Sequence, residues 1–165
     1  MAHQFTVNVA IQGVSLEDFK RLAADTSLHE AVCRRIPGEN LEILESQKTG
    51  DMYTLKRAYN LDVNIPDIAK KLLKDAFRLH RTDVSDLAKM TSEVILDPNL
   101  PLEARCQRQV TGDASQIQFQ LEWTVKVKVP LIGGLLEKHA ETEIRRFSQL
   151  ELEIVEDELR KNLSA

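Results

Sequence analysis

The most regular pattern in the chain is the alternation of apolar and polar residues from position 116 to position 129. Every odd position from Ile117 to Val129 is apolar, and every even position from Gln116 to Lys128 is polar. A period of two buries one face of a β-strand and leaves the other face in water. A strand of this length spans about 43 Å, so we expect it to bend around a neighbouring element.

The period changes to that of a helix directly after Pro130 and the glycine pair at positions 133–134. Apolar residues recur every three or four positions from Leu136 to Leu163, which predicts a helix of about eight turns and about 45 Å. The strand and the helix would therefore match in length. A curved sheet packed on such a helix leaves space between the two, and we expect a cavity there.

The rest of the chain predicts short helices and strands. A short basic amphipathic helix, from Ile68 to Lys74, is expected before a strand that begins near Phe77 and ends close to His80 and Arg81. The other expected elements are a first strand over residues 5–11, short helices that begin near Ser15 and Thr26, a hairpin over residues 41–61 with its turn at residues 49–51, and strands around Val94 and over residues 103–111.

This order of elements is typical of an α+β fold in which one long C-terminal helix packs on an antiparallel sheet. Two short helices follow the first strand, and about six further strands precede the long helix. With 165 residues, of which 42% are hydrophobic, the chain is large enough to build one core of its own. We therefore expect a single domain over residues 1–165.

The segment from Val125 to Lys138, VKVKVPLIGGLLEK, resembles an uncharacterised bacterial family of the START-like superfamily. This superfamily has the helix-grip fold, which is also called the birch-pollen-allergen fold. The resemblance implies a strongly curved sheet of seven antiparallel strands that grips the C-terminal helix and encloses a hydrophobic cavity. Its relatives include lipid-transfer proteins, plant hormone receptors and polyketide cyclases, so the resemblance constrains the kind of ligand better than the activity.

Composition excludes some classes of function. Charged residues make up 29% of the chain, the net charge is −4, and no run of Lys and Arg suits a nucleic acid. The sequence shows neither a signal peptide nor 18 consecutive apolar residues, so we expect a cytoplasmic protein. Cys33 and Cys106 are far apart in sequence and are expected to be buried free thiols of a reducing compartment.

No catalytic or metal-binding signature is present. The four histidines do not have the spacing of metal ligands. Glu137, His139 and Glu141 are close together in the long helix, but residues two positions apart point in different directions. We therefore predict no catalytic residue, no metal site and no cofactor.

Polar residues on apolar faces are the candidates for ligand recognition. Arg57 shares one face of a predicted strand with Tyr53 and Tyr59, and Arg108 shares one face with Cys106. A buried guanidinium group needs a carboxylate, access to solvent or an anionic ligand. Two interpretations remain open: each arginine reaches solvent at a sheet edge or pairs with an acidic side chain, or one of them binds the carboxylate or phosphate head of an amphipathic ligand.

The predicted ligand-binding set adds residues of the long strand and the long helix. His139 points into the mouth of the cavity or flanks the core, and both alternatives remain open. The segment from Ile68 to Lys74 is either a solvated lid or a site of transient contact with an anionic membrane. The full set of predicted ligand-binding residues is Tyr53, Arg57, Tyr59, Arg108, Phe119, Leu121, Trp123, His139, Ala140 and Ile144.

Three functions compete on this basis. The first is binding or transport of a lipophilic small molecule such as a lipid, fatty acid, isoprenoid or polyketide-like compound. The second is an enzyme of the cyclase or aromatase type, in which Arg57, Tyr59, Arg108 or His139 would transfer a proton. The third is a protein-interaction module that binds no ligand and uses the outer face of the long strand. The sequence favours the first function and predicts no oligomeric state.

Overall fold

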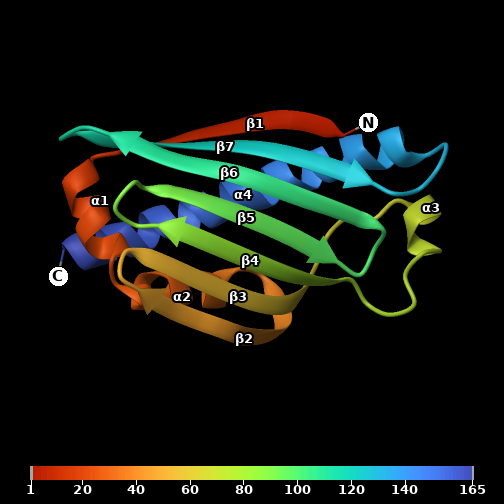
Figure 1. Cartoon of the computed structure of the whole chain (residues 1–165), viewed down its shortest axis with the longest axis horizontal. Coiled ribbons are helices and arrows are strands. Elements are labelled where there is room, and N and C mark those ends of the chain that lie inside the picture. Colours follow the sequence, from red (N-terminus) through yellow and green to blue (C-terminus); the bar gives the residue numbers. More distant parts are fainter. Residues whose placement is uncertain (1, 165) are drawn as a thin grey trace.

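The computed structural model describes residues 2–164 (Figure 1). Within these residues, seven strands form one antiparallel sheet in the order β1-β7-β6-β5-β4-β3-β2. The elements in chain order are β1 (His3–Gln12), α1 (Leu16–Ala23), α2 (Thr26–Arg35), β2 (Gly38–Thr49), β3 (Met52–Leu61), α3 (Asp67–Lys70), β4 (Arg78–Asp86), β5 (Thr91–Pro98), β6 (Leu102–Gly112), β7 (Gln116–Val127) and α4 (Gly133–Leu163).

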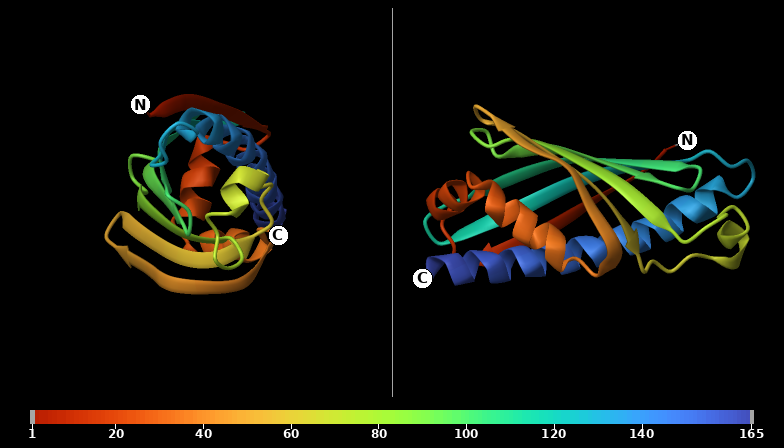
Figure 2. Two further views of the ribbon diagram at one scale, coloured as in Figure 1. Left: turned by 90° about the vertical axis from the view of Figure 1, so that its right-hand side faces the viewer. Right: turned by 90° about the horizontal axis from the view of Figure 1, so that it is seen from below.

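The sheet is a meander in which the first strand of the chain also pairs with the last. Strands β2 to β6 each pair with the next strand in the chain, and β1 pairs with β7 in a continuous register from His3↔Val125 to Gln12↔Gln116. Two register shifts between β2 and β3 mark bulges, which bend a strand and increase its twist. The sheet therefore curves, and α4 lies in its concave face (Figure 2). This arrangement confirms the expected helix-grip α+β fold.

The long strand and the long helix form as their periods predict. In β7 the inward residues from Ile117 to Val125 are buried, while Gln118, Gln120 and Glu122 between them are exposed. Helix α4 runs over 31 residues and packs against β1, β7, α1 and α2. The β2–β3 hairpin turns at Thr49 to Met52, as expected.

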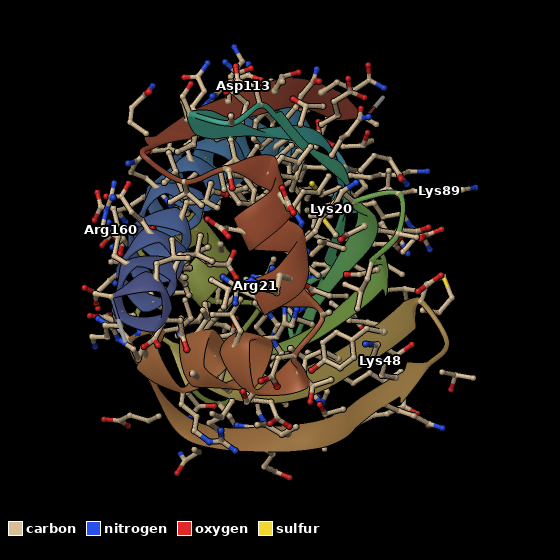
Figure 3. All side chains as sticks on the ribbon, turned by 90° about the vertical axis from the view of Figure 1, so that its left-hand side faces the viewer. Lys20, Arg21, Lys48, Lys89, Asp113 and Arg160 are labelled. Atoms are coloured by element: carbon tan, nitrogen blue, oxygen red, sulfur yellow. The ribbon has the colours of Figure 1, made fainter. Side chains whose placement is uncertain are left out.

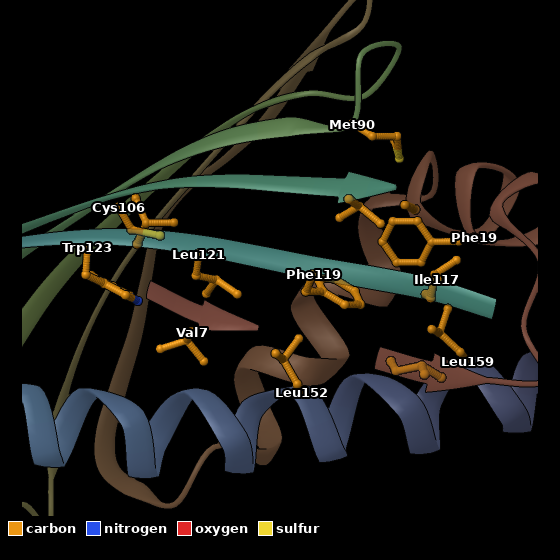
Figure 4. Packing of buried hydrophobic residues seen from close by; sticks show 14 of the residues in the cluster. Val7, Phe19, Met90, Cys106, Ile117, Phe119, Leu121, Trp123, Leu152 and Leu159 are labelled. Carbon is orange, nitrogen blue, oxygen red and sulfur yellow. The ribbon is translucent and has the colours of Figure 1, made fainter. Parts of the chain in front are cut away.

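The two short helices cover one end of the sheet (Figures 1 and 3). The side chain of Ser15 caps α1 by accepting the backbone N–H of Asp18 at 3.0 Å. Phe19 of α1 points inward and meets Phe119 of β7 edge-to-face, with ring centroids 5.5 Å apart. Leu152 and Leu159 of α4 complete this part of the core (Figure 4).

Both cysteines are buried and free, as the sequence predicts. Burial raises the pKa of Cys106 to about 12, so this thiol stays protonated at neutral pH. A buried neutral thiol packs as a small apolar side chain.

Two local predictions were wrong. Helix α3 ends at Lys70 and does not reach Lys74. The backbone N–H groups of Leu72 and Leu73 donate to the carbonyl oxygens of Ala69 and Lys70, three residues back, as in a turn. So short a helix has little stability of its own. Strand β4 begins at Arg78 and continues to Asp86, so Arg81 lies in its first half and not near its end.

Candidate functional site

A cavity of about 150 Å³ lies between the inner face of the sheet and the first half of α4. One water molecule needs roughly 10–15 Å³ of such volume, so the cavity has room for a small organic molecule. Strands β3 to β7, α3 and α4 all contribute to its wall. Its apolar side chains include Leu61, Val63, Ile65, Leu72, Phe77, Leu79, Leu96, Leu100, Val127, Leu136, Ala140, Ile144 and Phe147.

Small side chains help to keep this space open. Ala104 of β6 and Ala140 of α4 both line the cavity, on the sheet and on the helix respectively. A leucine at either position would extend further into the cavity, as protein interiors are otherwise closely packed. The cavity thus follows from the residue types on the two facing surfaces as well as from the curvature of the sheet.

Polar side chains occupy part of the wall. Tyr59, Arg81 and Glu151 line the cavity together with Ser148. Burial raises the pKa of Tyr59, so its hydroxyl group is protonated at neutral pH and can donate a hydrogen bond. Trp123 also lines the cavity, and Figure 4 shows its indole extending from β7 toward α4. The buried Nε1–H of this indole has no hydrogen-bond partner in residues 2–164. Such an unpaired buried donor is unfavourable by about 1–3 kcal/mol.

Behind this wall is a buried charge cluster, which we define as Arg57, Arg81, Asp83, Arg108 and Glu151. Arg81 makes a two-pronged contact with Asp83, from Nε to Oδ1 at 2.8 Å and from Nη2 to Oδ2 at 3.0 Å. Arg57 Nη1 donates to the same Oδ1 at 3.0 Å, and Arg108 Nη1 lies 3.9 Å from Oδ2. Glu151 of α4 reaches Arg81 at 3.0 Å and Arg57 at 3.8 Å, so the buried charge cluster joins the helix to the sheet.

The charges in the buried charge cluster fix one another. Burial alone would raise the pKa of Asp83, but the guanidinium groups of Arg57 and Arg81, followed by that of Arg108, hold it well below its usual 3.8. Burial would lower the pKa of Arg81, yet Asp83 and Glu151 raise it well above its usual range. Asp83 and Arg81 are therefore charged at neutral pH. The buried charge cluster as a whole brings together three basic and two acidic side chains.

The structure places the predicted ligand-binding residues in three regions. Tyr59, Trp123, His139, Ala140 and Ile144 line the cavity. Arg108 and Phe119 line a separate pocket of about 30 Å³ near α1. Tyr53, Arg57 and Leu121 line neither space. Tyr53 contacts Ser46 at 2.8 Å, Arg57 pairs with Asp83, and Leu121 belongs to the core. The role of each in ligand binding stays a prediction.

Of the two interpretations of Arg57, pairing with an acidic side chain or with an anionic ligand, the structure shows the first, with Asp83 as the partner. Sequence reasoning missed Arg81 and Glu151, although both line the cavity. A signal existed for each. Arg81 lies two positions from both Leu79 and Asp83, so all three share the inward face of β4. Glu151 follows Phe147 by four positions, so both lie on the side of α4 that faces the cavity.

A short loop at the cavity wall is tied to α4. Asn64 donates its backbone N–H to Glu143 Oε1 at 2.6 Å, and its carbonyl oxygen contacts His139 Nε2. Arg146 binds Glu143 at 2.7 Å and also reaches the carbonyl oxygen of Asp62 at 3.3 Å. Although burial opposes it, the contacts with Arg146 and Asn64 lower the pKa of Glu143. His139 thus lines the cavity and also contacts the loop that bounds it.

Residues 2–164 contain no group of three or more His, Cys, Asp or Glu side chains that could hold a metal ion. No helix in this part of the chain is both long and apolar enough to span a membrane.

Known structures share this architecture at low sequence identity. TTHA0849 from Thermus thermophilus has a TM-score of 0.65 and 14% identity, over 97% of this chain and 99% of its own. The Zhui aromatase/cyclase from Streptomyces sp. R1128 has a TM-score of 0.64 and 15% identity, over 98% and 96%. Ara h 8.0201 has a TM-score of 0.65 and 14% identity, over 98% and 99%. These likenesses establish the helix-grip fold.

No curated protein matches the chain at a significant level. A family does match it. Residues 6–159 fit the family described as protein of unknown function DUF2505, so the chain belongs to this family, as the resemblance of residues 125–138 to an uncharacterised START-like family had indicated.

Proposed function

We propose that this protein binds a lipophilic small molecule in the cavity between the sheet and α4, and that it carries or sequesters this ligand. The observation that supports the proposal most directly is the cavity of about 150 Å³ with its largely aliphatic and aromatic wall. Removing apolar ligand surface from water contributes about 25 cal/mol per Å². A lipid, fatty acid, isoprenoid or polyketide-like compound has such a surface.

The polar part of the wall supports a ligand with one hydrogen-bond acceptor. Trp123 Nε1–H lacks a partner, and the Tyr59 hydroxyl group is protonated and lines the same cavity. The buried charge cluster beside them contains three basic and two acidic side chains, and its Arg81 and Glu151 line the same cavity. A carbonyl or carboxylate oxygen suits these surroundings, because it accepts hydrogen bonds and is stabilised by the positive potential.

The enzyme alternative requires a group that exchanges a proton near neutral pH. Burial raises the pKa of Tyr59 above its usual 10. Burial opposes the shift of Arg81, but Asp83 and Glu151 raise the pKa of its guanidinium group well above its usual range. Both shifts move Tyr59 and Arg81 away from neutrality, so neither residue favours a cyclase or aromatase. His139 lines the same cavity and is the residue left for that alternative, while the largely apolar wall favours a carrier. Recovery of a chemically altered ligand after incubation with the protein would reverse this preference.

The test begins with protein purified without detergent, from which small molecules are extracted and identified by mass spectrometry. A lipophilic compound in stoichiometric amount is expected. The identified compound then serves as the probe for binding titrations, in which Ala140→Trp fills the cavity and should weaken binding at least tenfold. Thr142→Trp is the matched control, because Thr142 lies on the exposed side of the same helix.

Unchanged binding by folded Ala140→Trp protein would contradict the proposed site. Thermal unfolding of both variants distinguishes a filled cavity from a failure to fold. If Ala140→Trp does not fold, the smaller change Ala140→Leu repeats the measurement with less overpacking.

A further inference from the structure

The joint between β7 and α4 exposes a leucine in an unusual backbone conformation. Leu131 is fully exposed, at 104% of its reference area, and its φ is 72°. Residues other than glycine rarely adopt a positive φ. A glycine at this position would be relaxed, and a polar side chain would be well hydrated. The requirements of the turn therefore do not explain a leucine here.

Hydrogen bonds fix the joint on both sides of Leu131. Val127 N–H donates to Glu137 Oε2 at 3.0 Å, and Lys128 N–H donates to the carbonyl oxygen of Pro101 at 2.8 Å. On the other side, Ile132 N–H donates to the carbonyl oxygen of Pro130 at 2.9 Å. The side chain of Leu131 is thus presented outward by a braced loop.

Other exposed aliphatic side chains lie at the same end of the molecule. We define the apolar rim as Ile68, Leu72, Leu131 and Leu135, which account for four of the six exposed large hydrophobic residues within residues 2–164. Figures 1 and 2 place α3 and the β7–α4 joint together at this end. Leu72 also lines the cavity, together with Ala69 of α3 and Val127 and Leu136 on the two sides of the joint, so the apolar rim adjoins this end of the cavity.

Lysines accompany the apolar rim. Lys70, Lys71 and Lys74 are exposed around Leu72, while Lys128 and Lys138 are exposed on either side of Leu131 and Leu135. Asp67, which lies 3.5 Å from Lys70, and Asp75 are also exposed here, whereas Glu137 is buried, so five exposed lysines face two exposed aspartates. The surface is therefore locally basic, although the chain as a whole has a net charge of −4.

We propose that the apolar rim docks on the surface of an anionic phospholipid membrane, with Leu131 at its apex. Aliphatic side chains enter the boundary between head groups and acyl chains, and lysines attract anionic head groups. Docking in this orientation places the end of the cavity that adjoins the apolar rim against the lipid. The proposal goes beyond binding of a ligand and holds whether or not the cavity carries one.

The test is flotation of the purified protein with vesicles of phosphatidylcholine, with and without phosphatidylserine. We expect the protein to float with vesicles that contain phosphatidylserine, and less so at high salt, which screens the lysines. Leu131→Gly should bind these vesicles about tenfold more weakly, because burial of the leucine is lost. It should unfold at the same or a higher temperature, because glycine adopts a positive φ easily.

The matched controls are Leu131→Ser and Leu44→Ser. Leu44 is also exposed, at 54%, but lies in β2, away from the apolar rim. Only Leu131→Ser should lower vesicle binding. Equal binding by wild-type and Leu131→Gly protein would overturn the proposal, as would absence of the wild-type protein from all floating fractions. Self-association in solution that Leu131→Gly abolishes, without vesicle binding, would assign the apolar rim to a second copy of this chain instead.

Discussion

The two ends of the space between the sheet and α4 are built alike but filled differently. At the α1 end, Phe19 inserts between the layers and packs edge-to-face on Phe119, which leaves a pocket of only about 30 Å³. At the α3 end, the four-residue helix α3 contributes only the small side chain of Ala69 to the wall, and about 150 Å³ stays open. The inward alternation of β7 continues unchanged through both ends. The difference therefore comes from the elements that cover the sheet and not from the strand itself.

The buried charge cluster lies between these ends. Arg108 lines the small pocket, whereas Arg81 and Glu151 line the large cavity. Glu151 also holds α4 to the sheet at this level. A charged layer in the middle of the interior thus separates a packed half from an open half and keeps their spacing fixed.

The largest effect is expected when this separating layer is broken. Asp83→Ala leaves Arg57 and Arg81 buried without their shared carboxylate, which should lower the free energy of unfolding by about 3–5 kcal/mol. Urea denaturation measures the change. Asp75→Ala, at an exposed position, is the control and should change stability by less than about 0.5 kcal/mol. A loss below about 1 kcal/mol for Asp83→Ala would mean that the cluster is not important for stability.

The packed and open halves should respond differently to loss of an aromatic ring. Phe19→Ala removes a buried ring from the packed half and should lower the free energy of unfolding by about 3 kcal/mol. Phe77→Ala removes a half-buried ring that lines the cavity, and should lower it by about half as much. Similar losses in the two variants would show that the open half is packed as tightly as the other.

A smaller change in the free energy of unfolding is expected at acidic pH. The folded-state pKa of Asp83 lies below its ordinary 3.8, so the unfolded chain takes up the proton first. The stability that Asp83 provides is fully present well above pH 3.8 and is lost as the pH falls through 3.8 toward the folded-state pKa. The difference in unfolding free energy between wild-type and Asp83→Ala protein should therefore shrink below pH 3.8. A difference that stays constant down to the lowest measurable pH would contradict this assignment.

The sequence predicted those parts of the fold whose periodicity is uninterrupted. Strand β7 and helix α4 bury one continuous face each, and both were correctly placed. Strand β4 was cut short because its inward positions Arg81, Asp83 and Ser85 are polar, so the alternation is hidden. Helix α3 was extended too far because apolar spacing alone does not stabilise so short a helix.

The site was predictable only in part, for the same reason. Trp123 and Ala140 lie on continuous apolar faces, so their positions on the cavity wall follow from the periods of β7 and α4. The partners of Arg57 do not follow from any local pattern. Asp83 is on the neighbouring strand, and Glu151 comes from the helix layer. Which end of the interior stays open depends on where Phe19 inserts, and this is a property of tertiary packing.

The pairing of β1 with β7 has a consequence for how the protein folds. Strands β2 to β7 can form one after another, since each pairs with its neighbour in the chain. The partners of β1 are more than 100 positions away in sequence, from Gln12↔Gln116 to His3↔Val125. Closing so long a loop is entropically unfavourable and slows folding. Strand β1 therefore joins the sheet late, and until it does, β7 presents an open edge to which other chains can add.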